Sequence, residues 1–239
     1  MKFYADLIRE HGYTPGIWLT PFNFWKDTDT VKNHPDWFVH TKSDEFAEKD
    51  GCCMLDATHP EVQERIRKLY RKLTFDWGFR YLKIDIVSVY MTVGIYHDPN
   101  AGALQNLREY FRLIRESVHP DTYIIGCTCP MFEVAEFVDG MRVSGDIFER
   151  WESLIEVFNV IFKRFFMNRT LYISAPDCLM PRKAENEDDD CRRYCTRTDE
   201  EIHTFQVAMY AAGGALFISD KLPLMKMTGR SIYTRKCSR

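Results

Sequence analysis

Two stretches of the sequence place ionisable side chains where a strand would hold them in fixed positions. In the first, residues 81–87, Lys83 and Asp85 alternate with Leu82, Ile84 and Ile86. Because successive strand side chains point to opposite faces, the lysine and the aspartate share one face and the aliphatic residues share the other. A lysine and a carboxylate directed into a packed interior lose their hydration unless they pair or serve a site. Asp85 is therefore a candidate catalytic carboxylate, and an antiparallel strand with one wet face is the alternative.

The second stretch, residues 138–151, offers another carboxylate. Arg142, Ser144 and Asp146 share a face if the strand continues, and Gly145 is expected to let the backbone turn sharply and carry Asp146 over the mouth of a barrel. Two acids from separate strands suit hydrolysis of a glycosidic bond, in which one carboxylate attacks or steadies the anomeric carbon and the other protonates the leaving oxygen. The alternative is an ion pair between Arg142 and Asp146 that closes a loop.

Aromatic residues gather close to both stretches. Several lie around the end of the first strand-like run, and Trp151 follows the second acid. The apolar C–H faces of a pyranose ring stack on aromatic planes, so this cluster suits a sugar ligand, although core packing is the commoner role of any single member. The cluster comprises Trp18, Phe22, Phe24, Trp25, Trp37 and Phe38.

The elements that must position these residues alternate between strands and helices. Aliphatic or β-branched runs are separated by polar loops and by stretches with helical spacing, a pattern typical of βα units around a parallel sheet. Residues 1–11 are predicted to form a helix that ends at Gly12. Thr58 and Thr198 each begin a predicted capping box, with a glutamate three residues later. The expected strands are residues 14–20, 80–87, 122–127, 140–144, 170–174 and 214–219.

The composition disfavours several classes of function. The chain has 239 residues, 45% of them hydrophobic, which is enough apolar material for a sizeable globular core. Its 32 Lys and Arg nearly balance its 35 Asp and Glu, so there is no excess positive charge to hold nucleic acid or an anionic membrane surface. No run approaches the ~18 apolar residues of a membrane span, and the N-terminus lacks the apolar core of a secretory signal. A cytoplasmic location is therefore expected.

The eight cysteines are expected to be reduced thiols. Their closest groups lack the paired CxxC spacing that surrounds a zinc ion, so no metal is expected. The sequence also lacks the glycine-rich nucleotide-binding motifs, GxSxG and HExxH. No cofactor is therefore expected, and the sequence indicates no oligomeric state.

Taken in order along the chain, these motifs resemble the catalytic barrel of glycoside hydrolase family 36, the α-galactosidases, which is related to family 27. Residues 81–85 match the K-x-D motif of the family's fourth strand. Residues 16–22 resemble its third strand, and residues 55–62 resemble the lead-in to the next helix. Further resemblance, within coverage from about residue 5 to 225, is found at residues 125–130 and 138–151 for strands five and six, 175–182 for strand seven and 212–220 for strand eight.

The resemblance implies an α/β fold, the (β/α)8 or TIM barrel, and a retaining double displacement on α-linked galactose in oligosaccharides. It makes Asp85 the nucleophile and Asp146 the general acid/base, with Lys83 and Arg142 as contacts to sugar hydroxyls. The same matched segments provide further substrate-binding candidates, namely Trp18, Cys127, Trp151 and Asp177.

Elementary electrostatics agrees with this division of roles. Lys83 is expected to favour the ionised form of Asp85, as a nucleophile requires. Asp146 is expected to be kept protonated by the charge of its fellow acid and by burial.

The chain departs from the family pattern in what it lacks. No counterpart of barrel strands one and two is visible, so about six of eight βα units are expected, in an N-terminally truncated barrel over residues 1–227 followed by a frayed tail at residues 228–239. Strand two of the family supplies acids that choose galactose over glucose, and Ser174-Ala175 also departs from the pattern, which leaves the role of Asp177 open. A retaining α-galactosidase is the leading expectation. An α-N-acetylgalactosaminidase and a non-catalytic carbohydrate-binding remnant are the alternatives.

Overall fold

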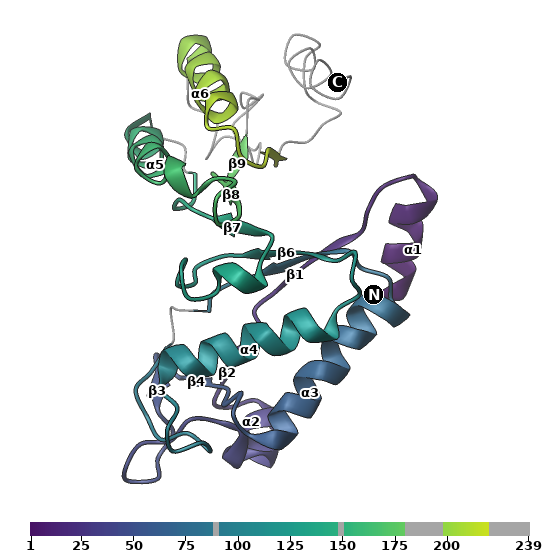
Figure 1. Ribbon diagram of the computed structural model, residues 1–239, viewed down its shortest axis with the longest axis vertical. Helices are drawn as coiled ribbons and strands as arrows, with labels where there is room; N and C mark the ends of the chain where they lie inside the picture. The colour runs from purple at the N-terminus through teal and green to yellow at the C-terminus, as the bar shows by residue number, and fades with distance from the viewer. Residues whose placement is uncertain (88–90, 148–150, 180–197, 220–239) are drawn as a thin grey trace. The chain divides into compact units, whose positions relative to one another are not determined.

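The computed structural model describes residues 1–87, 91–147, 151–179 and 198–219, and the chain divides into two compact units, Met1–Met141 and Arg142–Arg239. Each unit combines helices with parallel strands, which confirms the predicted α/β class (Figure 1). Within these described ranges, no helix is both long and apolar enough to cross a membrane. The acidic stretch at residues 185–190 and the tail at residues 228–239 lie outside them.

Parallel strands form the centre of the first unit: β1 (Gly16–Leu19), β5 (Tyr81–Ile84) and β6 (Tyr123–Gly126). β5 pairs with β1 on one side and with β6 on the other, and the last residues of the three strands are register partners. The next strand, β7 (Gly140–Arg142), begins beside β6 and ends in the second unit. The residues that follow β1, β5 and β6 therefore meet at one edge of the sheet.

Two helices, α3 (Pro60–Arg71) and α4 (Ala103–Ser117), lie side by side in the first unit (Figure 1). Their apolar faces and one face of β5 form the core, with Leu82 and Ile84 both 0% exposed. The strand alternation predicted for residues 81–84 is confirmed. Buried residues of the two helices include Val62, Ile66, Tyr70, Leu107, Tyr110, Phe111 and Ile114.

Two of the three helix ends predicted from capping residues are observed as expected. The first helix, α1 (Lys2–Glu10), ends as predicted before Gly12, whose φ is 79°. The capping box at Thr198 is confirmed at the start of α6 (Asp199–Ala211). The capping box at Thr58 is wrong, because the Thr58 hydroxyl donates to Asp56 at 2.6 Å and His59 caps α3 instead.

A small antiparallel sheet in the first unit has no counterpart among the predicted strands. Its strands are β2 (Asn23–Trp25), β3 (Glu48–Lys49) and β4 (Cys52–Met54), with β4 paired to both of the others. Between β2 and β3 lie the short helices α2 (Asp29–Asn33) and η1 (Pro35–Trp37). Phe22, Trp37 and Phe38 from the aromatic cluster are buried around this sheet, so these members serve the core.

The second unit contains α5 (Trp151–Lys163), α6, and the strands β8 (Ile173–Ala175), β9 (Cys178–Leu179) and β10 (Phe217–Ile218). β8 follows β7 in the sheet, since the Val143 N–H donates to the Ala175 carbonyl at 3.0 Å, and β9 pairs in parallel with β10. Each of the six predicted strand segments therefore contains a strand. The remaining short helical segments are η2 (Lys72–Asp76), η3 (Ala135–Phe137) and η4 (Phe165–Met167).

Candidate active site

Asp85 lies at the edge where the central strands of the first unit end. The Asp85 N–H donates to the Leu19 carbonyl at 2.9 Å, at the end of β1. On the other side, the Cys127 N–H donates to the Ile84 carbonyl at 2.8 Å, at the end of β5. The carboxyl ends of parallel strands are the usual position of catalytic and binding residues in α/β folds. This edge is therefore the candidate site.

Hydrogen-bond donors surround the carboxylate of Asp85, which is 9% exposed. Oδ1 accepts from the Ile86 N–H at 2.7 Å and from the Thr128 hydroxyl at 2.9 Å. Oδ2 accepts from the indole N–H of Trp18 at 2.9 Å, and the Lys83 ammonium lies 3.3 Å away. The arrangement favours an ionised carboxylate with a fixed orientation.

The surroundings of Asp85 act on its pKa in opposite directions. Burial raises the pKa, but hydrogen bonds from Trp18, Cys127, the Ile86 N–H and Thr128 outweigh burial and lower it to about 2. Lys83 lies where the sequence predicts, yet these hydrogen bonds, which the sequence does not reveal, are the main cause of the lowered pKa.

Cys127 is a buried donor beside this carboxylate. Burial first, and then the hydrogen bond to Asp85, raise the pKa of the Cys127 thiol to about 11. The thiol therefore stays protonated at neutral pH and donates a hydrogen bond to the Asp85 carboxylate.

Two β-branched residues adopt left-handed backbone conformations next to the carboxylate. The φ angle is 55° at Ile86 and 48° at Thr128, and both residues donate to Oδ1 of Asp85. Such conformations cost of order 1–3 kcal/mol each and persist only where the surrounding structure enforces them. The predicted alternation through Ile86 is wrong at this residue, because the strand ends at Ile84 and the chain turns the Ile86 N–H back toward Asp85.

The low pKa of Asp85 predicts a specific dependence of stability on pH. Because the folded-state value of about 2 lies below the ordinary value of 3.8, the carboxylate stabilises the folded state above pH 3.8. We expect this contribution, roughly 2 kcal/mol, to disappear as the pH falls toward the folded-state pKa. Urea unfolding of the native chain and Asp85→Asn, compared from about pH 6 downward, measures it. A difference between the two proteins that stays constant with pH would contradict the expectation.

A second group of charged residues lies in the second unit, around Arg142. This arginine is 7% exposed and contacts two carboxylates, Asp146 at 2.9 Å through Nη2 and Asp177 at 2.8 Å through Nη1. Asp177 is 14% exposed at its side chain, and its Oδ2 accepts from the Ile147 N–H at 2.8 Å. Asp177 therefore holds both Arg142 and the backbone after Asp146.

Asp146 differs from its expected environment. Its side chain is 75% exposed and not buried as expected, and the alternative, an ion pair with Arg142, is present. The strand stops at Arg142 and does not continue through Ser144. Gly145 has no left-handed backbone, and an added Cβ would meet no atom within 4 Å, so the expected need for glycine at this turn is wrong.

The structure thus brings the sequence-predicted site residues together in two groups, one within each unit. The first consists of Trp18, Lys83, Asp85 and Cys127. The second consists of Arg142, Asp146 and Asp177, and half-buried Trp151 begins α5 in the same unit.

Sequence reasoning missed two residues that support Asp85. Thr128 donates to its carboxylate, and the side-chain amide of Asn23 donates to the Ile86 carbonyl at 2.7 Å. Neither residue belongs to a recognisable motif, because one role depends on a left-handed φ and the other on the unpredicted small sheet.

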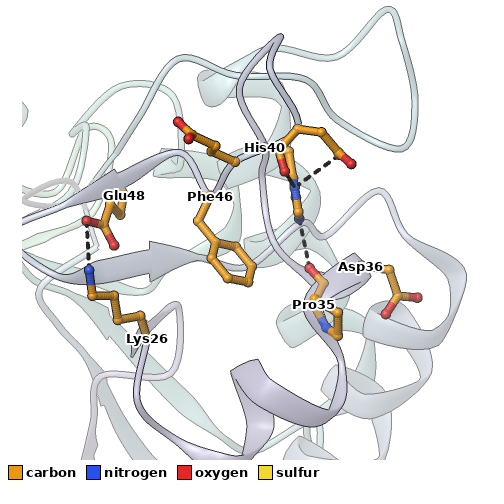
Figure 2. A pocket seen from close by; sticks show the side chains of 8 residues that line it. Lys26, Pro35, Asp36, His40, Phe46 and Glu48 are labelled. Carbon is orange, nitrogen blue, oxygen red and sulfur yellow. Dashed lines mark hydrogen bonds and ion pairs between the residues drawn. The ribbon is translucent and has the colours of Figure 1, made fainter.

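An open cleft of about 950 Å³ lies elsewhere in the first unit (Figure 2). Lys26 and Glu48 form an ion pair at 3.2 Å on one side of it, and the His40 ring contacts the Pro35 carbonyl at 2.9 Å on another. None of the predicted site residues lines this cleft, so it is separate from the candidate site. Its lining residues are Lys26, Pro35, Asp36, His40, Asp44, Glu45, Phe46 and Glu48.

Metal-ligand geometry is absent from the part of the chain that the structure describes. No group of three or more His, Cys, Asp and Glu side chains there is arranged to hold a metal ion. Among the cysteines that the structure describes, Cys52, Cys53, Cys127 and Cys129 form no disulfide bond.

Comparison with known proteins supports the sequence resemblance. Residues 1–112 match the model of the melibiase family. Among solved structures, the chain is similar to the α-galactosidase TtGalA from Thermus thermophilus in complex with stachyose, with 21% identity and a TM-score of 0.76 over 98% of this chain and 51% of that one. It is also similar to a GH27 β-L-arabinopyranosidase from Geobacillus stearothermophilus, with 16% identity and a TM-score of 0.72 over 98% of this chain and 55% of that one.

A third similar structure is the α-galactosidase from Lactobacillus brevis, with 15% identity and a TM-score of 0.69 over 99% of this chain and 31% of that one. The chain thus spans about half or less of the length of these solved structures. At these identities, the structural similarity establishes the fold.

Proposed function

We propose that the chain, whose residues 1–112 match the melibiase family model, supplies catalytic residues of a retaining α-galactosidase on a partial (β/α)8 barrel. Its substrates are oligosaccharides with a terminal α-linked galactose. The observation that carries this proposal is the Asp85 carboxylate, which lies at the carboxyl edge of parallel strands and is kept ionised by several donors. A carboxylate that is mostly buried yet ionised is suited to attack on an electrophilic carbon.

The proposed reaction is a double displacement. In the reaction that the family resemblance implies, Asp85 attacks C1 of the galactose while Asp146, in its protonated form, gives a proton to the glycosidic oxygen, so that the C1–oxygen bond breaks and a galactosyl ester of Asp85 forms. Asp146 then takes a proton from water, the water oxygen attacks C1, and the ester bond breaks. Two inversions at C1 release galactose with its configuration retained.

The remaining residues of the proposal bind sugar or orient the acids. Lys83 and Trp18 lie beside Oδ2 of Asp85, where an ammonium and an indole could also meet sugar hydroxyls and a ring face. The thiol of Cys127 approaches the same carboxylate. In the second unit, Arg142 and Asp177 are proposed to bind sugar hydroxyls, and Trp151 is the proposed aromatic contact. Arg142 and Asp177 also hold the segment that bears Asp146.

Azide provides a test that separates the roles of the two acids. On 4-nitrophenyl α-galactoside, Asp85→Gly is expected to have almost no activity, and azide should restore turnover with β-galactosyl azide as the product of a single displacement. Asp146→Gly should still form the galactosyl ester, since 4-nitrophenolate leaves without a proton donor. Azide then attacks that ester and yields α-galactosyl azide. The configuration of each product is read by proton NMR.

The outcomes distinguish an enzyme from a carbohydrate-binding remnant. Binding of galactose by calorimetry, without turnover by the native chain, would favour the remnant. Turnover that persists in Asp85→Gly without azide would remove Asp85 from the role of nucleophile.

A further inference from the structure

Asn23 stands at the start of β2 and reaches the backbone that follows Asp85. Its side-chain Nδ2 donates to the Ile86 carbonyl at 2.7 Å. The N–H of the same isoleucine donates to Oδ1 of Asp85, also at 2.7 Å. A single residue, Ile86, therefore links Asn23 to the carboxylate.

The small antiparallel sheet gives Asn23 a firm support. Asn23 is the register partner of Met54 on β4. The preceding residue, Phe22, is 0% exposed, and its carbonyl accepts from the Leu55 N–H at 3.0 Å. The Phe22 ring packs edge-on against Tyr110 of α4, with 4.9 Å between ring centroids. The backbone that bears the amide is thus fixed by both the sheet and the core.

Ile86 requires such an outside partner. Its φ of 55° is rare for a β-branched residue, which relaxes toward negative φ unless contacts oppose the change. Relaxation would rotate the peptide planes on either side of Ile86, including the plane that carries its N–H. The hydrogen bond from Asn23 to the carbonyl opposes this rotation and so keeps the N–H directed at Asp85.

We propose that Asn23 is a positioning residue for the Asp85 carboxylate and acts through the Ile86 peptide. The inference rests on the proposed function only for its effect on kcat, because Asp85 is the nucleophile only under that proposal. The neutral amide is suited to the task because it donates to a carbonyl. An aspartate at this position would present only acceptor oxygens to that carbonyl and a second negative charge to the site.

Asn23→Ala removes the donor and provides the test. The pKa of Asp85, read from the pH titration of its carboxyl ¹³C resonance, is expected to rise by about one unit as the Ile86 N–H turns away. We expect kcat on 4-nitrophenyl α-galactoside to fall about tenfold while KM changes less than about twofold, because the reacting oxygen is displaced. Asn33→Ala, the same change at an exposed position of α2, is the matched control and is expected to alter none of these quantities.

A second variant separates positioning from general support of the fold. Glycine adopts a positive φ without steric cost, so Asn23→Ala combined with Ile86→Gly should bring the Asp85 pKa and kcat back toward the native values by more than half. A structural role of Asn23 alone predicts no such recovery. If Asn23→Ala does not fold, the Asp85 titration in folded Asn23→Leu, which lacks the donor and adds no charge, decides, and an unshifted pKa there contradicts the proposal.

The ¹³C titration keeps the two proposals distinguishable. A raised Asp85 pKa in Asn23→Ala supports the positioning role even if the native chain turns over no galactoside, in which case only the catalytic proposal fails. An unchanged Asp85 pKa in an active, folded Asn23→Ala overturns the positioning role and leaves the catalytic proposal intact.

Discussion

Asp85→Asn is expected to lower kcat/KM on an aryl α-galactoside by roughly 10⁴-fold or more, the scale seen when a covalent nucleophile is removed. The amide has nearly the shape of the carboxylate but has neither its charge nor its nucleophilicity. The loss should appear mainly in kcat, because Trp18 and Lys83 remain available to the sugar. Initial rates with the purified variant, measured alongside the native chain, give the ratio.

The matched control for this variant is Asp27→Asn, the same change at an exposed position of the first unit. It is expected to retain native kcat/KM. A native-like circular dichroism spectrum for Asp85→Asn excludes unfolding as the cause of its inactivity. Retention of more than about a tenth of native kcat/KM would contradict the role of Asp85, because removal of a nucleophile costs far more than removal of a binding contact.

Arg142→Met is expected to lower the free energy of unfolding by about 3–5 kcal/mol. The guanidinium is 7% exposed and contacts Asp177, whose side chain is 14% exposed, so the substitution leaves a mostly buried carboxylate without its counter-charge. Its other partner, Asp146, is 75% exposed and contributes much less, because water can replace the arginine there. Urea unfolding followed by circular dichroism measures the change.

A double variant tests the cause of this loss. If an unpaired buried charge destabilises Arg142→Met, then adding Asp177→Leu should cost less than the sum of the two single changes. Arg67→Met, at a half-buried position of α3, is the control for replacing an arginine by methionine and is expected to change stability by less than about 1 kcal/mol. Additive losses in the double variant would show that the buried ion pair is not the source.

Residues whose positions depend on local periodicity were predictable from the sequence. The period of two in residues 81–85 is sufficient to place Lys83 and Asp85 on one face and Leu82 and Ile84 in the core. The start of α6 at the Thr198 cap and the end of α1 before Gly12 depend on capping chemistry within a few neighbouring residues. In both cases, interactions close in the sequence decide the outcome.

Residues whose positions depend on distant partners were not predictable. The turn at Ile86 needs Asn23, which lies 63 residues earlier, and the Thr128 hydroxyl reaches Asp85 across 43 residues. The strands of the small sheet contain only two or three residues each, too few to show a period. The predicted cap at Thr58 fails for a local reason instead, since Asp56, two residues earlier, accepts from its hydroxyl.

The raised pKa of Cys127 has a consequence for chemical labelling. With a pKa of about 11, only about one in 10⁴ of these sulfurs is a thiolate at pH 7, and alkylating reagents react with the thiolate. Iodoacetamide will therefore spare the sulfur nearest to Asp85 under mild conditions. Loss of activity after alkylation would have to be traced to modification at another position.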